Sequence, residues 1–409
     1  MPTSVDARPP CIVLGLETQI GLGIVRELGR AGVRVIGIAQ ENDAIGLTSR
    51  YLARRLVVTE PRSQQLLRTI RALGDELGEC CLIAVSEANL IWLATHHGEF
   101  GRVRPIAPAL SVLDMVLDKQ STLRVAQTVG ISIPETAEPQ SMAEVQGLAV
   151  SFRFPAVLKW KDPAAVAGLL EAASLEMVKA EYVYSSEQLI AVGLRYQPIA
   201  QWPLVQEYCA GYGLGQFFYM HNGQPVRGFQ HRRVAEWPPE GGFSSVCDTI
   251  PLDHHTDLQE RSVALLRAIN WEGVAMVEYR MNPITGKAVL MEINGRFWGS
   301  YPLAVECGAG FALIAYYLNS NLGMPPLPPL RKGVRSRMVA TEFKRLGRIF
   351  FQPNLIIDRS FKIRRIAEIS RFLIDFLRPR VTYYVWSISD PRPFCTDILN
   401  LLRKIVSRI

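Results

Sequence analysis

Residues 274–294 have the pattern of two strands joined by a turn: VAMVEYRM (274–281), NPITG (282–286) and KAVLMEIN (287–294). Successive side chains of a strand point to opposite faces, so Glu292 and Asn294 share one face of the second strand. An antiparallel pairing through a turn of three or five residues puts Glu278 of the first strand on that same face. Two carboxylates and an amide oxygen are then expected to converge.

Carboxylate and amide oxygens suit Mg²⁺, which completes its octahedral shell with water and phosphate oxygens. Arg296, just past the second strand, could hold a phosphate or a carboxylate bidentately. The alternative is an ordinary charged strand face in solvent. The pattern of this hairpin alone leaves both interpretations open.

Two lysines upstream have the character of phosphate ligands. Lys159 lies in FPAVLKW (154–160), a predicted strand that is otherwise apolar and offers no acidic partner. A buried lysine is costly without a counter-charge, so an external phosphate would serve it. Alternatively, Lys159 reaches water from the end of its strand. Lys119 lies near the start of a helix predicted over 114–130, and an ordinary surface role is open for it too.

Two further segments could contact a nucleotide. Gln206, Glu207 and Tyr208 end a predicted strand and precede the glycine loop at 211–213. Such a segment can present backbone groups to an adenine edge and a side chain to the ribose. Residues 236–245, after Arg233, form a flexible, hydroxyl-rich turn in this interpretation and could cover a phosphate or substrate. An ordinary surface loop is the alternative.

Composition limits the class of protein. The chain has 409 residues, of which 48% are hydrophobic, so we expect two to four folded domains and exclude a disordered chain. The seven cysteines form no C-x-x-C pair and suit a reducing compartment. With no basic flank at the start and no 18-residue apolar run, neither a signal peptide nor a membrane span is expected. These features favour a bacterial or archaeal cytoplasm.

The N-terminal region alternates strands and helices, which predicts a parallel α/β sheet. Strands are expected at 11–14, 33–38 and 81–85, and helices at 22–28 and 62–77. The glycines at 15, 21 and 23 do not have the spacing of a dinucleotide-binding G-x-G-x-x-G motif. Turns and close helix–sheet packing are the favoured explanation for them.

The C-terminal region is strongly basic. After a stiff proline-rich linker at 324–330, residues 331–409 carry 18 Lys and Arg against 6 Asp and Glu, a net of +12. The whole chain has a net charge of +7, so the first 330 residues have a net of −5. The region is predicted to be helical and amphipathic. A helical cap with a solvated basic face, contact with an anionic membrane surface and contact with an acidic glycan stay open. No recognised nucleic-acid-binding module appears.

Taken in order, the motifs resemble the ATP-grasp superfamily, and most strongly its carbamoyl-phosphate-synthetase-like branch of carboxylate–amine ligases. The N-terminal region resembles the pre-ATP-grasp domain of that group in Val13-Leu-Gly15, in residues 23–29 and in Ser49-Arg-Tyr51. The likeness covers residues 10 to 325. The remaining matching motifs are Asp118-Lys119, Pro155-Ala-Val-Leu-Lys159, Gln206-Glu207-Tyr208, Glu278-Tyr279 and Glu292-Ile-Asn294-Gly-Arg296.

The resemblance implies a fold of mixed α/β and α+β class. A parallel α/β pre-ATP-grasp domain is expected at 1–112. An ATP-grasp domain of two α+β subdomains, 113–200 and 201–325, would follow, and a basic helical extension would occupy 326–409.

The resemblance also implies site roles and a reaction. Lys119 and Lys159 would contact ATP phosphates, and Gln206, Glu207 and Tyr208 would lie at the adenine and ribose hinge. Three side chains would hold Mg²⁺, with Mn²⁺ as a substitute, and two arginines would face the transferred phosphoryl group or the acyl substrate. The metal ligands are Glu278, Glu292 and Asn294, and the arginines are Arg233 and Arg296.

The implied reaction is ATP-dependent ligation of a carboxylate to an amine, or less readily a thiol, through an acyl phosphate. The substrates would be small or glycan-linked, and a homodimer is open. One departure concerns the lid, because residues 160–184 contain only Gly168 where many ATP-grasp enzymes have a glycine-rich loop. Lys179 or the loop at 236–245 could replace it. A nucleotide-dependent oxidoreductase or transferase and a non-catalytic ATP-binding module are the alternative functions.

Overall fold

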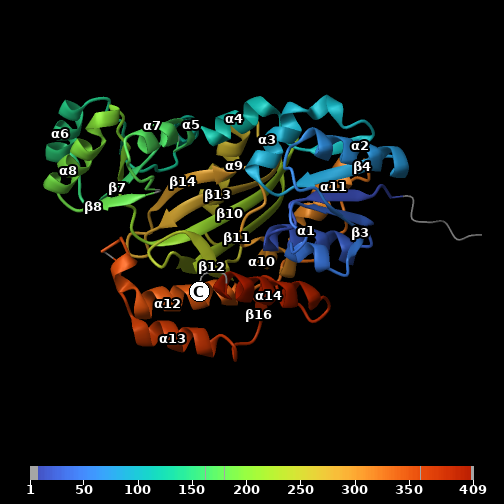
Figure 1. The fold of residues 1–409 in the computed structure, drawn as a ribbon. Helices are drawn as coiled ribbons and strands as arrows, with labels where there is room; N and C mark the ends of the chain where they lie inside the picture. Colours follow the sequence, from blue (N-terminus) through green and yellow to red (C-terminus); the bar gives the residue numbers. More distant parts are fainter. Residues whose placement is uncertain (1–7, 162, 179, 360, 407–409) are drawn as a thin grey trace, which may run out of the picture.

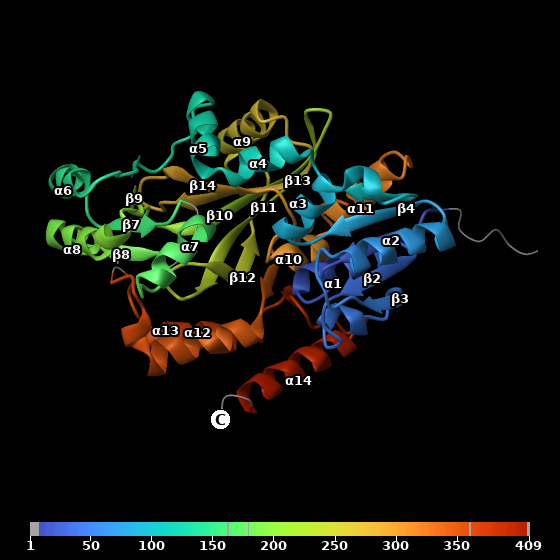
Figure 2. The same cartoon turned by 45° about the horizontal axis from the view of Figure 1, so that its top comes forward.

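The fold contains three sheets, which Figures 1 and 2 show from two sides. The computed structural model describes residues 8–161, 163–178, 180–359 and 361–406. Lys179, considered above for the phosphate lid, lies outside these residues.

The N-terminal sheet is parallel and has the strand order β3-β2-β1-β4-β5. Glycines allow its helices to pack closely, since a Cβ on Gly21 of α1 would lie 2.2 Å from the carbonyl oxygen of Gly15. The strands are β1 (Cys11–Leu14), β2 (Val35–Ala39), β3 (Leu52–Val57), β4 (Cys80–Ala84) and β5 (Val103–Ile106). The helices are α1 (Gln19–Arg30), α2 (Gln64–Leu77) and α3 (Glu87–Thr95), with short 3-10 turns η1 (Ile45–Thr48) and η2 (His97–Glu99).

A small antiparallel sheet follows, in the order β6-β9-β7-β8. It has its own apolar core, separate from the other two clusters of buried side chains. Its last strand lies beyond residue 200, where the sequence places a subdomain boundary. Its elements are β6 (Thr136–Ala137), α6 (Met142–Ser151), β7 (Ala156–Lys159), α7 (Pro163–Ala172), β8 (Glu181–Val183), α8 (Ser186–Tyr196), η3 (Gln197–Ile199) and β9 (Leu204–Glu207).

The large sheet has the order β14-β13-β10-β11-β12-β15-β16. All its pairs are antiparallel except β15 with β16. Its strands are β10 (Tyr212–His221), β11 (Gln224–Trp237), β12 (Phe243–Thr249), β13 (Gly273–Met281), β14 (Ala288–Asn294), β15 (Arg335–Arg337) and β16 (Val381–Tyr383). The helices that accompany it are α9 (Thr256–Ala268), α10 (Tyr301–Glu306) and α11 (Phe311–Asn319).

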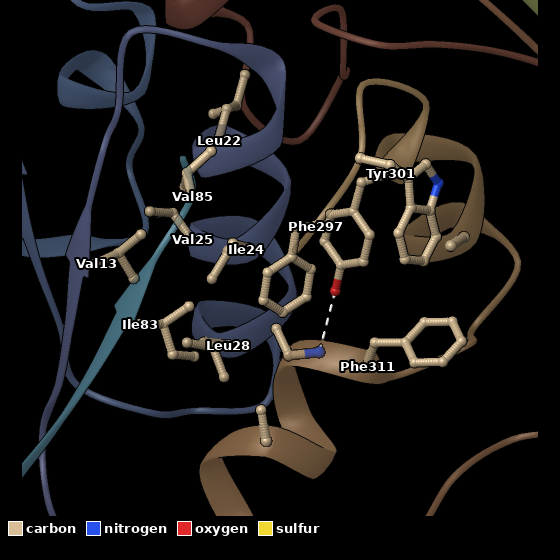
Figure 3. Close-up of a cluster of buried hydrophobic side chains, with 14 of the residues drawn as sticks. Val13, Leu22, Ile24, Val25, Leu28, Ile83, Val85, Phe297, Tyr301 and Phe311 are labelled. Carbon is tan, nitrogen blue, oxygen red and sulfur yellow. Dashed lines mark hydrogen bonds between the residues drawn. The ribbon is translucent and has the colours of Figure 1, made fainter. Parts of the chain in front are cut away.

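The N-terminal unit and the large sheet share their hydrophobic cores. One cluster joins β1 and α1 to α10 and α11, and a second joins the other face of β1 to β10 and β13. Figure 3 shows the first of these, in which Ile24 lies toward Phe297 and Val25 points toward Val13. The Tyr301 hydroxyl donates to Glu27 (2.7 Å) and accepts from the amide of Ala312 (3.1 Å). This shared core fixes the large sheet relative to the N-terminal unit.

Two sequence-based expectations need correction. The helix predicted over 114–130 is two helices, α4 (Leu110–Leu117) and α5 (Lys119–Thr128), because Asp118 breaks the first and caps the second. The loop predicted over 236–245 is shorter, since Trp237 pairs with Phe243 and only residues 238–242 connect β11 to β12. Arg345 of α12 (Val339–Phe351) donates to the carbonyl oxygens of Glu236 (2.9 Å) and Pro239 (3.0 Å), which holds this connection in place.

The C-terminal extension is helical, as α12, α13 (Arg365–Ile374) and α14 (Arg392–Val406) show, but it also supplies β15 and β16 to the large sheet. In both views the three helices lie along one side of the molecule (Figures 1 and 2). Among the described residues, no helix has the length and apolar character needed to cross a membrane.

Candidate active site

The hairpin of β13 and β14 places Glu278 directly opposite Glu292. Next to the turn, Met281 pairs with Ala288 and Tyr279 with Leu290, a register that by itself would put Glu278 opposite Met291. An irregularity between Glu278 and Tyr279 shifts the pairing by one residue. Such bulges re-aim side chains next to functional sites. The turn, residues 282–287, is therefore one residue longer than the five-residue turn expected from the sequence, and the bulge returns Glu278 to the face of Glu292.

Each of the two facing carboxylates has its own cation. Lys119 Nζ lies 3.2 Å from Glu292 Oε2, and Arg233 lies 2.5 Å from Glu278 Oε2. Asn294 Nδ2 also donates to Glu292 Oε1 (3.1 Å). Burial by itself would raise the pKa of Glu292, but Lys119 and Asn294 hold this pKa below its usual value. Burial raises the pKa of Glu278, despite Arg233, and the nearby Glu292 adds to the increase.

Lys119 is positioned by a helix start. The carboxylate of Asp118 accepts from the amides of Gln120 (3.0 Å) and Ser121 (3.3 Å) and from the Ser121 hydroxyl (2.6 Å). This is the usual N-cap arrangement, and it fixes Lys119 as the first residue of α5. The cap lies beside β14, which α5 contacts. The cap thus positions Lys119 beside the strand face that carries Glu292.

Lys159 ends β7 and points to the same cluster. Its Nζ donates to Gln206 Oε1 of β9 (3.2 Å), and Gln206 in turn donates to the Thr136 hydroxyl (3.1 Å). Burial lowers the pKa of Lys159, Lys119 lowers it further, and Glu292 and Glu278 partly offset both effects. Lys159 is thus a largely buried cation whose hydrogen bond goes to a neutral amide. An anionic ligand there would favour its charged form.

Arg233 of β11 is held within a chain of buried charges. It contacts Glu278 (2.5 Å) and Glu236 (3.1 Å), and Arg280 reaches Glu236 from the other side (3.1 Å). A Cβ on Gly213 would lie 2.6 Å from Arg233 Cδ, so this glycine makes room for the side chain. Burial disfavours the charge of Arg233, but Glu278 and Glu236 raise its pKa overall. Its charge is therefore fixed at any ordinary pH.

The predicted hinge is occupied on one side by the C-terminal extension. The hydroxyls of Tyr208 and Tyr184 donate to the buried carboxylate of Asp358, at 2.9 and 3.0 Å. Glu207 accepts from the amide of Glu135 (3.2 Å) and is partly exposed. The extension therefore reaches the junction of the two sheets beside Tyr208.

Arg296 has a different neighbourhood from the other predicted site residues. Its Nε lies 3.1 Å from Glu87 at the start of α3, and its Nη1 donates to the carbonyl oxygen of Phe297 (3.1 Å). These contacts tie Arg296 to the N-terminal unit. Hydrogen bonds and ion pairs bring together Lys119, Glu292, Asn294, Glu278 and Arg233, with Lys159 and Gln206 beside them.

Three residues in this region are absent from the sequence-based site. Arg280 has a detectable signal, because it shares the face of Glu278 on β13 by strand alternation. Glu236 is concealed in the segment predicted as a loop. Asp358 has no signal at all, since its partners lie 150 and 174 residues away along the chain.

The donor set fits a magnesium ion. Like charges directly opposite on a strand pair repel, and here Lys119 and Arg233 compensate the two carboxylates. A divalent cation between them would provide the same compensation. No cluster of three or more His, Cys, Asp or Glu with metal-site geometry occurs in the described parts of the chain. A metal here would therefore take Glu278, Glu292 and the Asn294 amide oxygen, with water and phosphate completing its shell.

A separate cavity of about 340 Å³ lies away from this cluster. Tyr212 and Arg232, which line it, point to the opposite face of the large sheet from Gly213 and Arg233, because strand side chains alternate. The cavity thus does not belong to the candidate site.

His231 is fully buried next to Arg233, and its Nε2 lies 2.7 Å from the Ser300 hydroxyl. Burial, and then the charge of Arg233, lowers the pKa of His231 to about 3. The unfolded chain takes up this proton below pH 6.5 and the folded chain does not. We therefore expect stability to fall as the pH drops below 6.5, by about 2 kcal/mol at pH 5 from this group.

The test is urea denaturation of the wild type and of His231→Gln at several pH values. Because all other groups titrate in both proteins, the difference between the two pH profiles isolates His231. The wild type should lose more stability than the variant between pH 6.5 and 5. Parallel profiles would contradict a neutral, buried His231.

Residues 246–325 match the family described as carbamoyl-phosphate synthase L chain, ATP binding domain. The structure is similar to biotin carboxylase from Campylobacter jejuni, with a TM-score of 0.60 at 13% identity over 80% of this chain and 74% of that one. It is also similar to the L-amino acid ligase from Bacillus licheniformis, with a TM-score of 0.54 at 14% identity over 78% and 75% of the two chains.

The chain has the ATP-grasp fold. A third similar structure is the biotin carboxylase domain of the 2-oxoglutarate carboxylase from Hydrogenobacter thermophilus (TM-score 0.57, 13% identity, 80% and 73% covered), described in complex with MgADP and bicarbonate. No curated protein sequence matches the chain. The predicted resemblance is thus confirmed, as is the fold class of a parallel sheet combined with antiparallel sheets.

Proposed function

We propose that this ATP-grasp protein is an ATP-dependent ligase that joins a carboxylate to an amine through an acyl phosphate. The contact between Lys119 Nζ and Glu292 (3.2 Å) carries the proposal. It joins one predicted phosphate ligand to the predicted metal hairpin, with Lys159 and the opposite carboxylate of Glu278 as neighbours. Two lysines, two facing carboxylates and an amide at one point are the groups that a metal–nucleotide complex needs.

The nucleotide would lie between β7–β9 and the β13–β14 hairpin. Lys119 and Lys159 would hold phosphate oxygens, and the charge of a phosphate would replace the neutral Gln206 as the partner of Lys159. Glu207 and Tyr208 would face the adenine and the ribose. When bound, Mg²⁺, or Mn²⁺ in its place, would neutralise and orient the phosphates from Glu278, Glu292 and Asn294.

The chemistry would have two steps. A carboxylate oxygen of the substrate attacks the γ-phosphorus, the bond to ADP breaks, and an acyl phosphate forms. An amine then attacks the acyl carbon, phosphate leaves, and the amine loses a proton as the amide forms. The protein contributes fixed positive charges. They stabilise the negative charge of the transition state most strongly where water is excluded.

Arg233 would bind the phosphoryl group only after losing one of its present partners. Its guanidinium already donates to Glu278, to Glu236 and to the carbonyl oxygen of Gly242 (2.8 Å). Loss of Glu278 to a metal would free it for the phosphoryl group. Arg296 would face the acyl substrate if it leaves Glu87. The connection at 238–242, next to Arg233, is our candidate for the element that covers the phosphates.

The similar structures agree with this proposal, since they include an amino acid ligase and a domain described with MgADP. We place the reaction in the cytoplasm, where ATP is abundant and where seven free cysteines are stable.

The experiment is an ADP-release screen of the purified protein with Mg-ATP against pairs of carboxylates and amines, including amino acids and amino sugars. We expect ADP release that requires both substrates, with the Glu292→Gln variant as the blank. ADP release with no acceptor dependence would contradict a ligase. ATP binding without turnover under any mixture would support a non-catalytic module instead.

A further inference from the structure

The C-terminal extension exposes an unusual amount of apolar surface. Among the residues that the structure describes, 27 large apolar side chains are exposed, and 16 of them lie between residues 343 and 402. Single exposed apolar residues are normal, but a concentration of them on one segment marks an interaction surface. All three helices of the extension lie on the same side of the molecule (Figures 1 and 2).

Helix α13 has the clearest pattern. Ile366, Ile369 and Leu373 follow one another at spacings of three and four residues and form one stripe of the helix, and Leu377 lies in the turn just after it. Their exposed fractions are 82%, 41%, 57% and 87%. On the neighbouring face that turns to the body, Phe372 is buried beneath the Arg337 guanidinium, which lies 4.8 Å from its ring centroid. The helix is thus anchored by one side and presents its apolar stripe outward.

The acidic and basic side chains of the extension also differ in where they lie. Four of its six acidic residues form ion pairs with arginines and a fifth, Asp358, is buried against Tyr208 and Tyr184. The four ion pairs are Glu342–Arg337, Glu368–Arg345, Asp375–Arg335 and Asp390–Arg26. Exposed basic residues lie at the start of α13 and on both sides of it: Lys362, Arg364, Arg365, Arg378 and Arg380. The outer surface is therefore apolar with a positive border.

We propose that this outer face of residues 343–402, with α13 at its centre, binds an anionic membrane surface. An apolar stripe bordered by Lys and Arg is the arrangement that lies in the plane of the lipid head groups, with the apolar side chains below them and the cations on the phosphates. The extension binds on the membrane and does not cross it. The protein would thereby act on substrates held at, or released near, a lipid surface.

A second copy of the chain fits the same face less well. A two-fold interface brings the same patch of both copies together. The basic border of one copy would then face the basic border of the other, and this like-charge contact opposes association. Anionic lipid neutralises the border and covers the stripe.

The test is co-sedimentation of the full-length protein with vesicles. One set contains phosphatidylcholine alone and the other phosphatidylcholine mixed with phosphatidylglycerol. We expect binding to the mixed vesicles that weakens with added salt, and little binding to phosphatidylcholine. The double variant Ile366→Glu/Leu377→Glu should lower the vesicle-bound fraction at least about tenfold, because two apolar side chains that would be buried in the lipid surface become charged.

Val150→Glu is the matched control, since Val150 is 88% exposed at the end of α6, outside the extension. It should bind vesicles like the wild type. Arg364→Glu/Arg365→Glu should lose binding without changing the apolar stripe. All these positions are exposed, so circular dichroism should show folded proteins.

Two results would overturn the proposal. One is a dimer in sedimentation equilibrium that Ile366→Glu/Leu377→Glu converts to a monomer, with no vesicle binding by the wild type. The other is equal binding of the wild type and of the double variant to the mixed vesicles.

Discussion

Replacing Glu292 by glutamine is expected to lower ATP turnover by about 10²–10³-fold. The glutamine keeps the shape of the side chain but removes the charge that faces Glu278 and pairs with Lys119. Three effects combine: a metal loses an anionic ligand, Lys119 loses its counter-charge, and Asn294 keeps only a neutral acceptor. The variant should remain folded, because Glu292 is partly exposed.

Isothermal titration calorimetry with Mg-ATP tests this without knowledge of the acceptor. The wild type should bind Mg-ATP more tightly than ATP in the presence of a chelator, and Glu292→Gln should remove that difference. Glu181→Gln is the matched control, because Glu181 also pairs with a cation, Arg195, but lies on β8 away from the hairpin. Equal Mg²⁺ dependence in Glu292→Gln and the wild type would show that the metal assignment is wrong.

Arg337→Met is expected to lower the free energy of unfolding by about 3–5 kcal/mol. Arg337 is fully buried in β15, contacts Glu342 of α12 (2.5 Å) and donates to the carbonyl oxygen of Phe372 in α13 (3.2 Å). Its removal leaves Glu342 buried without a cation and takes a guanidinium from the rings of Phe372 and Phe376. One side chain thus joins the sheet to two helices of the extension.

Urea denaturation measures this loss, with Arg54→Met as the control. Arg54 pairs with Glu76 on the surface, where such a pair contributes about 1 kcal/mol or less. The double variant Arg337→Met/Glu342→Leu should recover much of the lost stability, because neither charge of this pair is then left buried without the other. A loss in Arg337→Met no larger than in Arg54→Met would contradict this role of the buried pair.

If the extension is joined to the body in this way, its proposed membrane face and its contact with the hinge belong to one rigid element. Asp358, between α12 and α13, bonds Tyr208 at the junction of the sheets, while α13 faces outward. Binding of the outer face to lipid would leave the candidate nucleotide site on the other side of the extension.

Local patterns in the sequence were sufficient to predict the strands that carry the candidate site residues. Alternation along β13 and β14 placed Glu278, Glu292 and Asn294 on a common face, and the buried position of Lys159 on an apolar strand marked it for an anion. The shared face is confirmed, because the period of a strand is a property of the backbone, and the role of Lys159 stays a prediction. The ordered set of motifs then indicated the ATP-grasp fold.

Which of these side chains come into contact depends on the tertiary structure. The bulge that aligns Glu278 with Glu292 and the Asp118 cap that delivers Lys119 depend on backbone geometry that periodicity does not encode. The pairing of Arg296 with Glu87 and the contact of Asp358 with Tyr208 join residues 209 and 150 positions apart. The residue types available on each strand and the basic character of the extension follow from the sequence alone. Folding decided the partners, because contacts over such separations are selected by packing of whole sheets and helices and leave no local signal.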